Sequence, residues 1–198
     1  QRPARRSEHE VERPGKRSGV RVVGGRLGGR SLVAPGGRAT RPTPERVREA
    51  LFSILGPADG DSVLDLFAGS GALGIEALSR GAGELTLVDS SAAAVSAIRR
   101  NLAALGVEAE VRAQPAEAFL REARKHGRQY DLVFLDPPYR QAASLGRWLP
   151  DALTPVLGPQ ARVVAESDRR EPLALAPLTC LDERRYGDTL IRIYSAPS

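Results

Sequence analysis

Hydrophobic and polar positions alternate along the chain in a way that predicts strands and helices in turn. Short apolar runs, typical of buried strands, lie at 62–67, 84–89, 109–114, 130–136 and 161–166. Stretches with helical periodicity lie between them, at 72–80, 91–105, 115–125 and 145–153. This alternation predicts an α/β fold with a parallel sheet, helices on both faces and right-handed crossovers. Residues 178–194 have two strand-like runs without a helix between them, which predicts a closing antiparallel hairpin.

The chain before residue 62 has a different pattern. Two β-branched runs separated by glycines in residues 20–35 predict a short basic β-hairpin. A helix is expected next, with Thr43 as its N-cap and Pro44 as its first residue. Its expected apolar stripe consists of Val47, Ala50, Leu51 and Ile54. We therefore divide the chain into a disordered basic tail (1–19), a basic hairpin appendage (20–40) and a main domain (41–198).

The charge of the protein is concentrated near the start of the chain. Residues 1–50 hold 13 of the 29 Lys and Arg and 5 of the 24 Asp and Glu, so this segment is strongly basic and the rest is slightly acidic. Such asymmetry favours contact with a polyanion, with a solubilising tail as the alternative for residues 1–18. The predicted RNA-binding residues are Arg21, Arg26, Arg30, Arg41 and Arg46, and Arg48 decorates the same predicted helix start. For each arginine, a solvated helix or hairpin face is the alternative.

Several classes of protein are disfavoured by composition. One cysteine and two histidines exclude an internal disulfide framework and predict no metal site. No apolar run approaches the ~20 residues that span a bilayer, so no membrane association is expected. We predict a soluble, cytoplasmic monomer.

A glycine-rich loop follows the first strand of the alternating region. Gly69, Gly71 and Gly74 fit the G-x-G-x-x-G spacing of dinucleotide sites, and Asp89 ends the next strand. Asp65, just before the loop, would repel a pyrophosphate but suits a ligand with an ammonium group. The pattern therefore favours S-adenosylmethionine, with its carboxylate at the loop, its ammonium toward Asp65 and its ribose at Asp89. Gln114 or the neighbouring backbone is the expected contact to the adenine.

A second motif, Asp136-Pro137-Pro138-Tyr139, ends the strand at 130–136. Parallel α/β sheets bind ligands at this edge, and the two prolines make the turn stiff. Asp136 and the Pro137 carbonyl can accept both hydrogens of an exocyclic amine while Tyr139 stacks on the base. Accepting both hydrogens directs the amine lone pair toward a methyl donor, and a base in a duplex must first be unstacked. These three residues are the predicted catalytic residues.

Four segments together resemble a known family. The glycine loop (65–82), the 136–139 motif, the upstream RPTPERVREALF (41–52) and the terminal YGDT (186–189) are similar to those of the RsmD-type methyltransferases. The resemblance implies a Rossmann-like class I methyltransferase domain with a seven-stranded sheet. It also implies S-adenosylmethionine-dependent methylation of the N2 amine of a guanine in 16S ribosomal RNA of the small subunit. The cofactor residues it implies are Asp65, Gly69, Ser70, Gly71, Asp89 and Ser90. Pro115 departs from the family, since a polar side chain more often helps to hold the adenine there.

Three other functions remain open at the level of sequence. A DNA adenine-N6 methyltransferase would use the same two motifs, but the chain leaves little room for a target-recognition domain. An NAD-dependent dehydrogenase would explain the glycines and leave Asp65 and the 136–139 motif without a role. The third is an RNA-binding assembly factor with a silent site.

Overall fold

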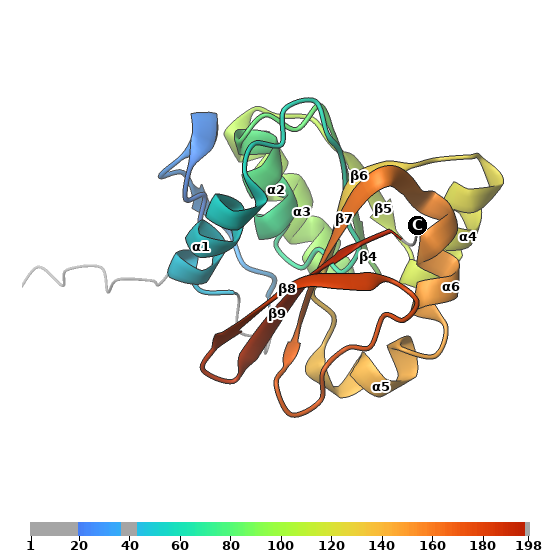
Figure 1. Ribbon diagram of the computed structural model, residues 1–198. Helices are drawn as coiled ribbons and strands as arrows, with labels where there is room; N and C mark the ends of the chain where they lie inside the picture. The colour runs from blue at the N-terminus through green and yellow to red at the C-terminus, as the bar shows by residue number, and fades with distance from the viewer. Residues whose placement is uncertain (1–19, 37–42, 197–198) are drawn as a thin grey trace, which may run out of the picture.

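The computed structural model describes residues 20–36 and 43–196, and its centre is one twisted sheet of seven strands (Figure 1). The strands follow the spatial order β5-β4-β3-β6-β7-β9-β8. Their bounds are β3 Ser62–Asp65, β4 Glu84–Asp89, β5 Glu110–Ala113, β6 Tyr130–Leu135, β7 Leu157–Asp168, β8 Thr179–Tyr186 and β9 Thr189–Ser195. Within the part of the chain that is described, we find no helix with the length and apolarity needed to cross a membrane.

The pairing of the strands confirms the predicted fold class. β3 to β7 pair in parallel, whereas β9 lies antiparallel to both β7 and β8. The carboxyl ends of β3, β4, β6 and β7 therefore share one edge of the sheet, where open α/β folds bind ligands. Because Asp168 at the end of β7 pairs with Thr189, the turn between β8 and β9 lies at that same edge. We call it the carboxyl edge.

Two layers of helices cover the sheet and divide the core in two (Figure 1). The helices are α1 Glu45–Leu55, α2 Ala72–Ser79, α3 Ala92–Leu105, α4 Ala116–Lys125, α5 Ala142–Leu145 and α6 Leu149–Leu153. Side chains of α1, α2 and α3 form one hydrophobic cluster with one face of the sheet. Side chains of α4, α5 and α6 form the second cluster with the other face. The central strands are buried on both faces, which explains their nearly unbroken apolar sequence.

The predicted N-terminal hairpin is present and is packed into the core. β1 (Val20–Arg21) and β2 (Ser31–Leu32) pair antiparallel around a short 3-10 helix at Gly25–Leu27. Val20, Val22, Leu27 and Leu32 are buried in the same cluster as α1 and α2. The division into three segments is untested, and the tail at 1–19 lies outside the described residues.

The structure corrects three local predictions. Thr43 does not cap α1, because its hydroxyl donates to the buried Glu166 at 2.5 Å and Pro44 occupies the cap position. The buried stripe of α1 is rotated from the expected one and consists of Val47, Arg48, Leu51, Phe52 and Leu55, while Ile54 is exposed. The predicted helix at 145–153 is two short helices, α5 and α6, separated at Gly146, Arg147 and Trp148.

Candidate active site

The glycine loop connects β3 to α2 at the carboxyl edge. Gly69 and Gly71 have φ angles of +55° and +80°, in the left-handed region that favours glycine. Gly71 is the N-cap of α2, so the first amides of the helix point toward the loop. A Cβ on Gly74 would lie 2.8 Å from the side chains of Leu85 and Leu87, so this glycine lets α2 pack closely on the sheet. The loop thus leaves backbone amides accessible to a negatively charged group.

Asp65 ends β3 beneath this loop with one oxygen atom unpaired. Its side chain is buried, and Oδ2 accepts a hydrogen bond from the Gly74 amide at 3.0 Å. Oδ1 is buried and has no hydrogen-bond partner. Burial raises the pKa of Asp65 to about 7; the Gly74 hydrogen bond opposes the shift and Asp89 adds to it. A buried carboxyl with an unsatisfied oxygen is suited to a cationic hydrogen-bond donor.

Asp89, at the end of β4, holds the loop in place. Its Oδ2 accepts from the Gly69 amide at 2.9 Å, and its Oδ1 accepts from the Ser91 amide at 2.8 Å. Ser91 in turn caps α3 through the Ala94 amide. Each carboxylate oxygen can accept a second hydrogen bond, so Asp89 can also bind the hydroxyls of a ligand.

A cavity with two lobes runs along the carboxyl edge, and Asp136 and most of the predicted cofactor residues line it. Gly71, Gln114 and Pro137 are not among the residues that line it. The first lobe, of about 80 Å³, is lined by Asp65, Gly69 and Ser70 on one side and by Arg48 and Thr43 on the other. The second, of about 140 Å³, is lined by Asp89, Ser90, Ala116, Pro138 and Gln141. Phe67, Gly69 and Asp136 border both lobes. The tertiary structure therefore brings together the residues predicted from two distant motifs.

Asp136 stands where the two lobes meet, directly after β6. The residue keeps some exposed surface, but the burial of its carboxyl raises its pKa well above the ordinary range. Glu166 and Asp65 raise this pKa further. Pro137 is buried, and the side chain of Tyr139 lies outside what the structure describes, so its stacking on a base stays a prediction.

Gln114 lies away from the cavity, in the ion-pair network of α4. Its side-chain amide donates to Glu122 at 3.3 Å, and the same carboxylate pairs with Arg112 at 2.5 Å. Ala116, two residues further on, lines the second lobe instead. Contact between the Gln114 side chain and the adenine stays a prediction that needs a change of rotamer.

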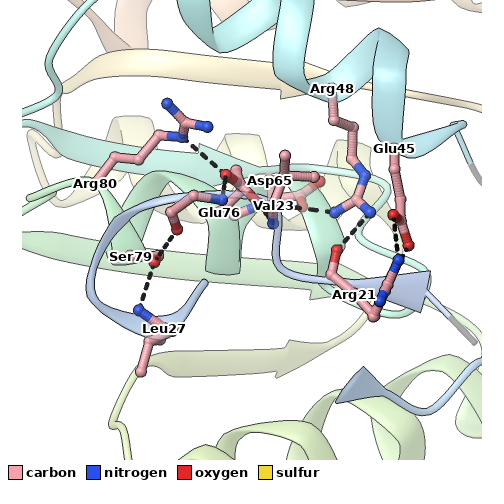
Figure 2. A network of polar contacts seen from close by, with 11 residues as sticks. Arg21, Val23, Leu27, Glu45, Arg48, Asp65, Glu76, Ser79 and Arg80 are labelled. Carbon is pink, nitrogen blue, oxygen red and sulfur yellow. Dashed lines mark hydrogen bonds and ion pairs between the residues drawn. The ribbon is translucent and has the colours of Figure 1, made fainter. Parts of the chain in front are cut away.

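A buried network of charges, which the sequence analysis missed, closes the first lobe (Figure 2). Arg48 is fully buried, its Nη2 donates to the Arg21 carbonyl at 2.6 Å, and its Nη1 lies 3.9 Å from Glu76 Oε2. Nε and Nη1 have no hydrogen-bond partner. Burial lowers the pKa of Arg48, and Glu76 opposes the shift. Arg48 thus holds unused N–H groups at the wall of the cavity.

Glu76 and Ser79 of α2 anchor the hairpin beside Arg48 (Figure 2). Glu76 accepts from the amides of Val23 and Gly24 at 2.6 and 2.8 Å and from Arg80 at 2.8 Å. Ser79 accepts from the Leu27 amide at 2.9 Å. Two signals were readable in the sequence. Arg48 has helical spacing to Leu51, Phe52 and Leu55, and Glu76 is the one charged residue of the mostly apolar α2.

Asn101 of α3 ties the segment after the hairpin to the glycine loop. Its side-chain amide donates to the carbonyls of Val33 and Ser70 at 3.0 and 2.9 Å. Its Oδ1 accepts from the Val33 amide at 2.7 Å. Residues 20–36 are thereby fastened to the cavity wall through Glu76, Ser79 and Asn101.

Of the predicted RNA-binding arginines, the four that the structure describes are exposed. Arg21 pairs with Glu45 at 3.1 Å, and Arg30 lies near the Ala104 carbonyl at the end of α3. Arg26 and Arg46 are exposed. Arg41 lies outside the described residues. RNA contact at these five positions stays a prediction.

The fold and the site together define a class. A doubly wound sheet closed by an antiparallel strand pair has a glycine loop after β3, an acidic residue at the end of β4 and Asp136-Pro137-Pro138 after β6. This is the arrangement of class I methyltransferases. In the part of the chain that is described, no group of three or more His, Cys, Asp or Glu could hold a metal ion.

The chain belongs to the family described as "Conserved hypothetical protein 95", whose model matches residues 20–195. It is 34% identical to Ribosomal RNA small subunit methyltransferase D of Haemophilus influenzae, over 93% of this chain and 98% of that protein. It is 44% identical to the protein of the same name from Escherichia coli K12, over 62% of this chain and 61% of that protein. The solved structure of yhhF from Escherichia coli has a TM-score of 0.78, with 38% identity over 91% of this chain and 99% of that one. The predicted membership of the RsmD family is thus confirmed.

Proposed function

We propose that this protein is an S-adenosylmethionine-dependent methyltransferase that acts on ribosomal RNA of the small subunit, at the N2 amine of a guanine. The observation that carries the proposal is the cavity beside the glycine loop, whose first lobe is lined both by Asp65, with its unsatisfied Oδ1, and by Asp136. The names of the relatives support ribosomal RNA as the substrate. The guanine-N2 specificity rests on the resemblance of the motifs to those of the RsmD-type enzymes.

The residues of the first lobe fit the amino-acid end of the cofactor. Asp65 offers an unsatisfied oxygen to an ammonium group, and Arg48 offers unsatisfied N–H groups to a carboxylate. The amides at the start of α2 offer further donors to the same carboxylate. Buried N–H groups and a buried carboxylate oxygen without hydrogen-bond partners cost free energy, and a zwitterionic ligand would satisfy both.

The second lobe fits the nucleoside end. Asp89 and Ser90 line it at the end of β4, where ribose hydroxyls would find acceptors. Gly69, Ser70 and Gly71 form the turn between the two lobes. When bound, S-adenosylmethionine supplies an electrophilic methyl group.

Asp136 is the residue proposed to bind the target amine. Its carboxylate accepts an N–H hydrogen bond, and its raised pKa makes it a suitable acceptor for the proton that the methylated nitrogen releases. The Pro137 carbonyl and the Tyr139 ring complete the amine site in this proposal. Because Asp136 must be ionised to accept, the rate should rise with pH until this carboxyl is deprotonated.

The alternatives fit the cavity less well. A pyrophosphate in the first lobe would meet the buried Asp65 carboxyl, which disfavours a nicotinamide dinucleotide. A DNA adenine-N6 methyltransferase would share both motifs, and only product analysis separates it from the proposed enzyme. A silent RNA-binding factor predicts cofactor-independent binding and no methyl transfer.

The decisive experiment combines labelled S-adenosylmethionine, unmodified small ribosomal subunits and mapping of the methylated nucleotide by mass spectrometry. We expect one guanine to carry the label on N2. Asp136→Asn should lower kcat by about 10²-fold or more while binding of RNA and of S-adenosylhomocysteine is kept. Asp151→Asn, on the exposed face of α6, is the matched control. Turnover of Asp136→Asn at the wild-type rate would overturn the assignment.

A further inference from the structure

A second basic surface lies at the carboxyl edge, on the last three strands of the chain. Arg169 and Arg170 follow β7, Arg185 lies near the end of β8, and Arg192 lies on β9. Together with Glu183, Pro172 and Leu190 they line a hollow of about 300 Å³. We call this hollow the arginine pocket.

The acidic residues around the arginine pocket order the guanidinium groups without cancelling their charge. Glu183 accepts from both Arg185 and Arg192 at 2.9 Å. Asp188 pairs with both Arg169 at 3.2 Å and Arg170 at 3.6 Å. Each of these two carboxylates therefore serves two arginines, and Asp168 and Glu171 flank the Arg169–Arg170 pair along the chain.

The guanidinium groups are also accessible to a large ligand. The side chains of Arg169, Arg170 and Arg185 are 51%, 70% and 73% exposed. The hydrogen bond from Arg185 holds the pKa of Glu183 below its usual range, so this acid remains ionised and keeps its arginines in position. Guanidinium groups held in fixed positions and open to solvent match the geometry of phosphate oxygens.

The location of the pocket distinguishes it from the tip of the predicted basic hairpin, whereas Val20 and Pro35 at the ends of the hairpin line the first lobe of the cavity. Asp168 and the β8–β9 turn lie at the carboxyl edge, which also carries Asp136 at the end of β6. The tip of the N-terminal hairpin instead contacts Ser79, the last residue of α2, and Arg30 contacts Ala104, near the end of α3. Helices between parallel strands run antiparallel to them, so these helix ends lie toward the opposite edge of the sheet.

We propose that the arginine pocket binds backbone phosphates of the RNA substrate and holds the strand against the edge of the sheet where the target base must enter. This inference rests on the proposed function, since it assigns a second contact to the same substrate. RNA is favoured over an acidic protein segment because the proposed function already brings an RNA strand to this edge of the sheet. The contact is to the backbone, so it adds affinity without reading sequence.

The test uses Arg169→Ala/Arg170→Ala and, separately, Arg185→Ala. The control is Arg121→Ala/Arg124→Ala, two exposed arginines on α4. For the first two variants we expect KM for small subunits to rise about fivefold or more, with kcat and the Kd of S-adenosylhomocysteine unchanged. The slope of log Kd for 16S RNA against log salt should fall by about 0.7 for each phosphate that the variant no longer binds. The control should leave both quantities within about twofold of the wild type, by the usual size of surface effects.

The outcomes separate this inference from the proposed function. If the wild-type protein methylates small subunits and the pocket variants keep its KM and salt slope, the inference is wrong and the proposed function stands. If KM rises for subunits but the Kd and salt slope for naked RNA do not change, the pocket contacts a protein and the inference is again wrong. If the wild type methylates no ribosomal RNA, the proposed function fails, and the RNA-binding measurement alone still decides the inference. Thermal unfolding of each variant checks that the fold is retained.

Discussion

Arginine occurs in two opposite settings in this protein. Arg48 is fully buried against the first lobe of the cavity, with two N–H bearing nitrogens unsatisfied. The arginines of the pocket between β7, β8 and β9 are mostly exposed and share two carboxylates in water. Burial makes the electrostatic interactions of Arg48 with its neighbours strong and only weakly dependent on salt. Each exposed ion pair of the arginine pocket is weak, but the exposed guanidinium groups together can attract a polyanion from a distance.

The comparison separates two tasks that one charged side chain can perform. A buried cation without a full set of partners fits a small ligand of defined charge. A group of exposed cations fits a long anion whose many phosphates each contribute little. The following predictions test whether buried and exposed charges differ in this way. Each changes a residue, the pH or the salt concentration and compares the responses of small-ligand binding, RNA binding or stability.

The largest effect is expected at Arg48. Arg48→Met should weaken the binding of S-adenosylhomocysteine about 10- to 100-fold, because a charge-assisted hydrogen bond contributes about 1.5–3 kcal/mol. Binding of 5′-methylthioadenosine, which lacks the amino-acid end, should change by less than about twofold. Isothermal titration calorimetry measures both ligands, with Arg46→Met on the exposed face of α1 as the control. Equal losses for the two ligands would assign Arg48 a purely structural role.

Asp65 should make cofactor binding depend on pH. Its pKa of about 7 means that the carboxyl is mostly protonated at pH 6 and mostly ionised at pH 8. An ammonium-bearing ligand binds the ionised form, so the affinity for S-adenosylhomocysteine should rise about tenfold over this range. Asp65→Asn should remove the dependence. An affinity that falls with rising pH would contradict the role assigned to Asp65.

The raised pKa of Asp65 also affects the stability of the ligand-free fold, which should fall with rising pH while the cofactor affinity rises. The folded state without ligand binds more protons than the unfolded chain between the ordinary pKa of 3.8 and the raised pKa of about 7. The contribution of Asp65 is therefore fully present below the lower value and is lost as the pH rises through the upper one. Urea unfolding should show that the free energy of unfolding falls less between pH 5 and pH 8 in Asp65→Asn than in the wild type.

Salt should separate the two arginine settings. Between 50 and 200 mM KCl, RNA affinity should fall about sevenfold for two single-strand phosphate contacts in the arginine pocket, and more with further contacts. The affinity for S-adenosylhomocysteine should stay within about twofold, because its contacts are buried. Fluorescence anisotropy with a labelled RNA fragment and calorimetry with the small ligand give the two slopes. If the affinities for RNA and for S-adenosylhomocysteine fell equally with salt, the two arginine settings would not differ as proposed.

The smallest effect is expected at Arg21. Its pair with Glu45 is exposed on both sides, at 58% and 40% of the side chains, so Arg21→Ala should leave the unfolding free energy nearly unchanged. RNA affinity should fall less than in Arg169→Ala/Arg170→Ala, because Glu45 cancels the charge of Arg21. Urea unfolding and RNA titration check the two expectations. A larger loss of RNA binding at Arg21 would place the main RNA contact on the hairpin.

Much of this fold was predictable because its signals are local. The alternation of apolar runs with helical periodicity predicted the order of strands and helices from residue 62 onward, and the break at 178–194 predicted the antiparallel end. Gly69, Gly71, Asp65, Asp89 and Asp136 were readable because the chain places them at strand ends, where parallel topology brings them to one edge.

The wrong predictions have a common physical cause. Thr43 satisfies the local rule for a helix cap, but its hydroxyl donates a hydrogen bond to the buried Glu166, 123 positions further along the chain. Ile54 is apolar and exposed, whereas Arg48 is charged and buried, because α1 turns toward Glu76 and the hairpin.

The amino-acid sequence by itself determined the class of fold, the glycine loop and the acidic strand ends, since each depends on residues close together in the chain. The tertiary structure alone decided which charges are buried, which are exposed and which oppose one another. Arg48, Glu76 and Asp65 come from three separate segments, and the arginine pocket joins the ends of three strands. The energy of a charge depends on its burial and on its neighbours, and both are set only when distant segments pack together.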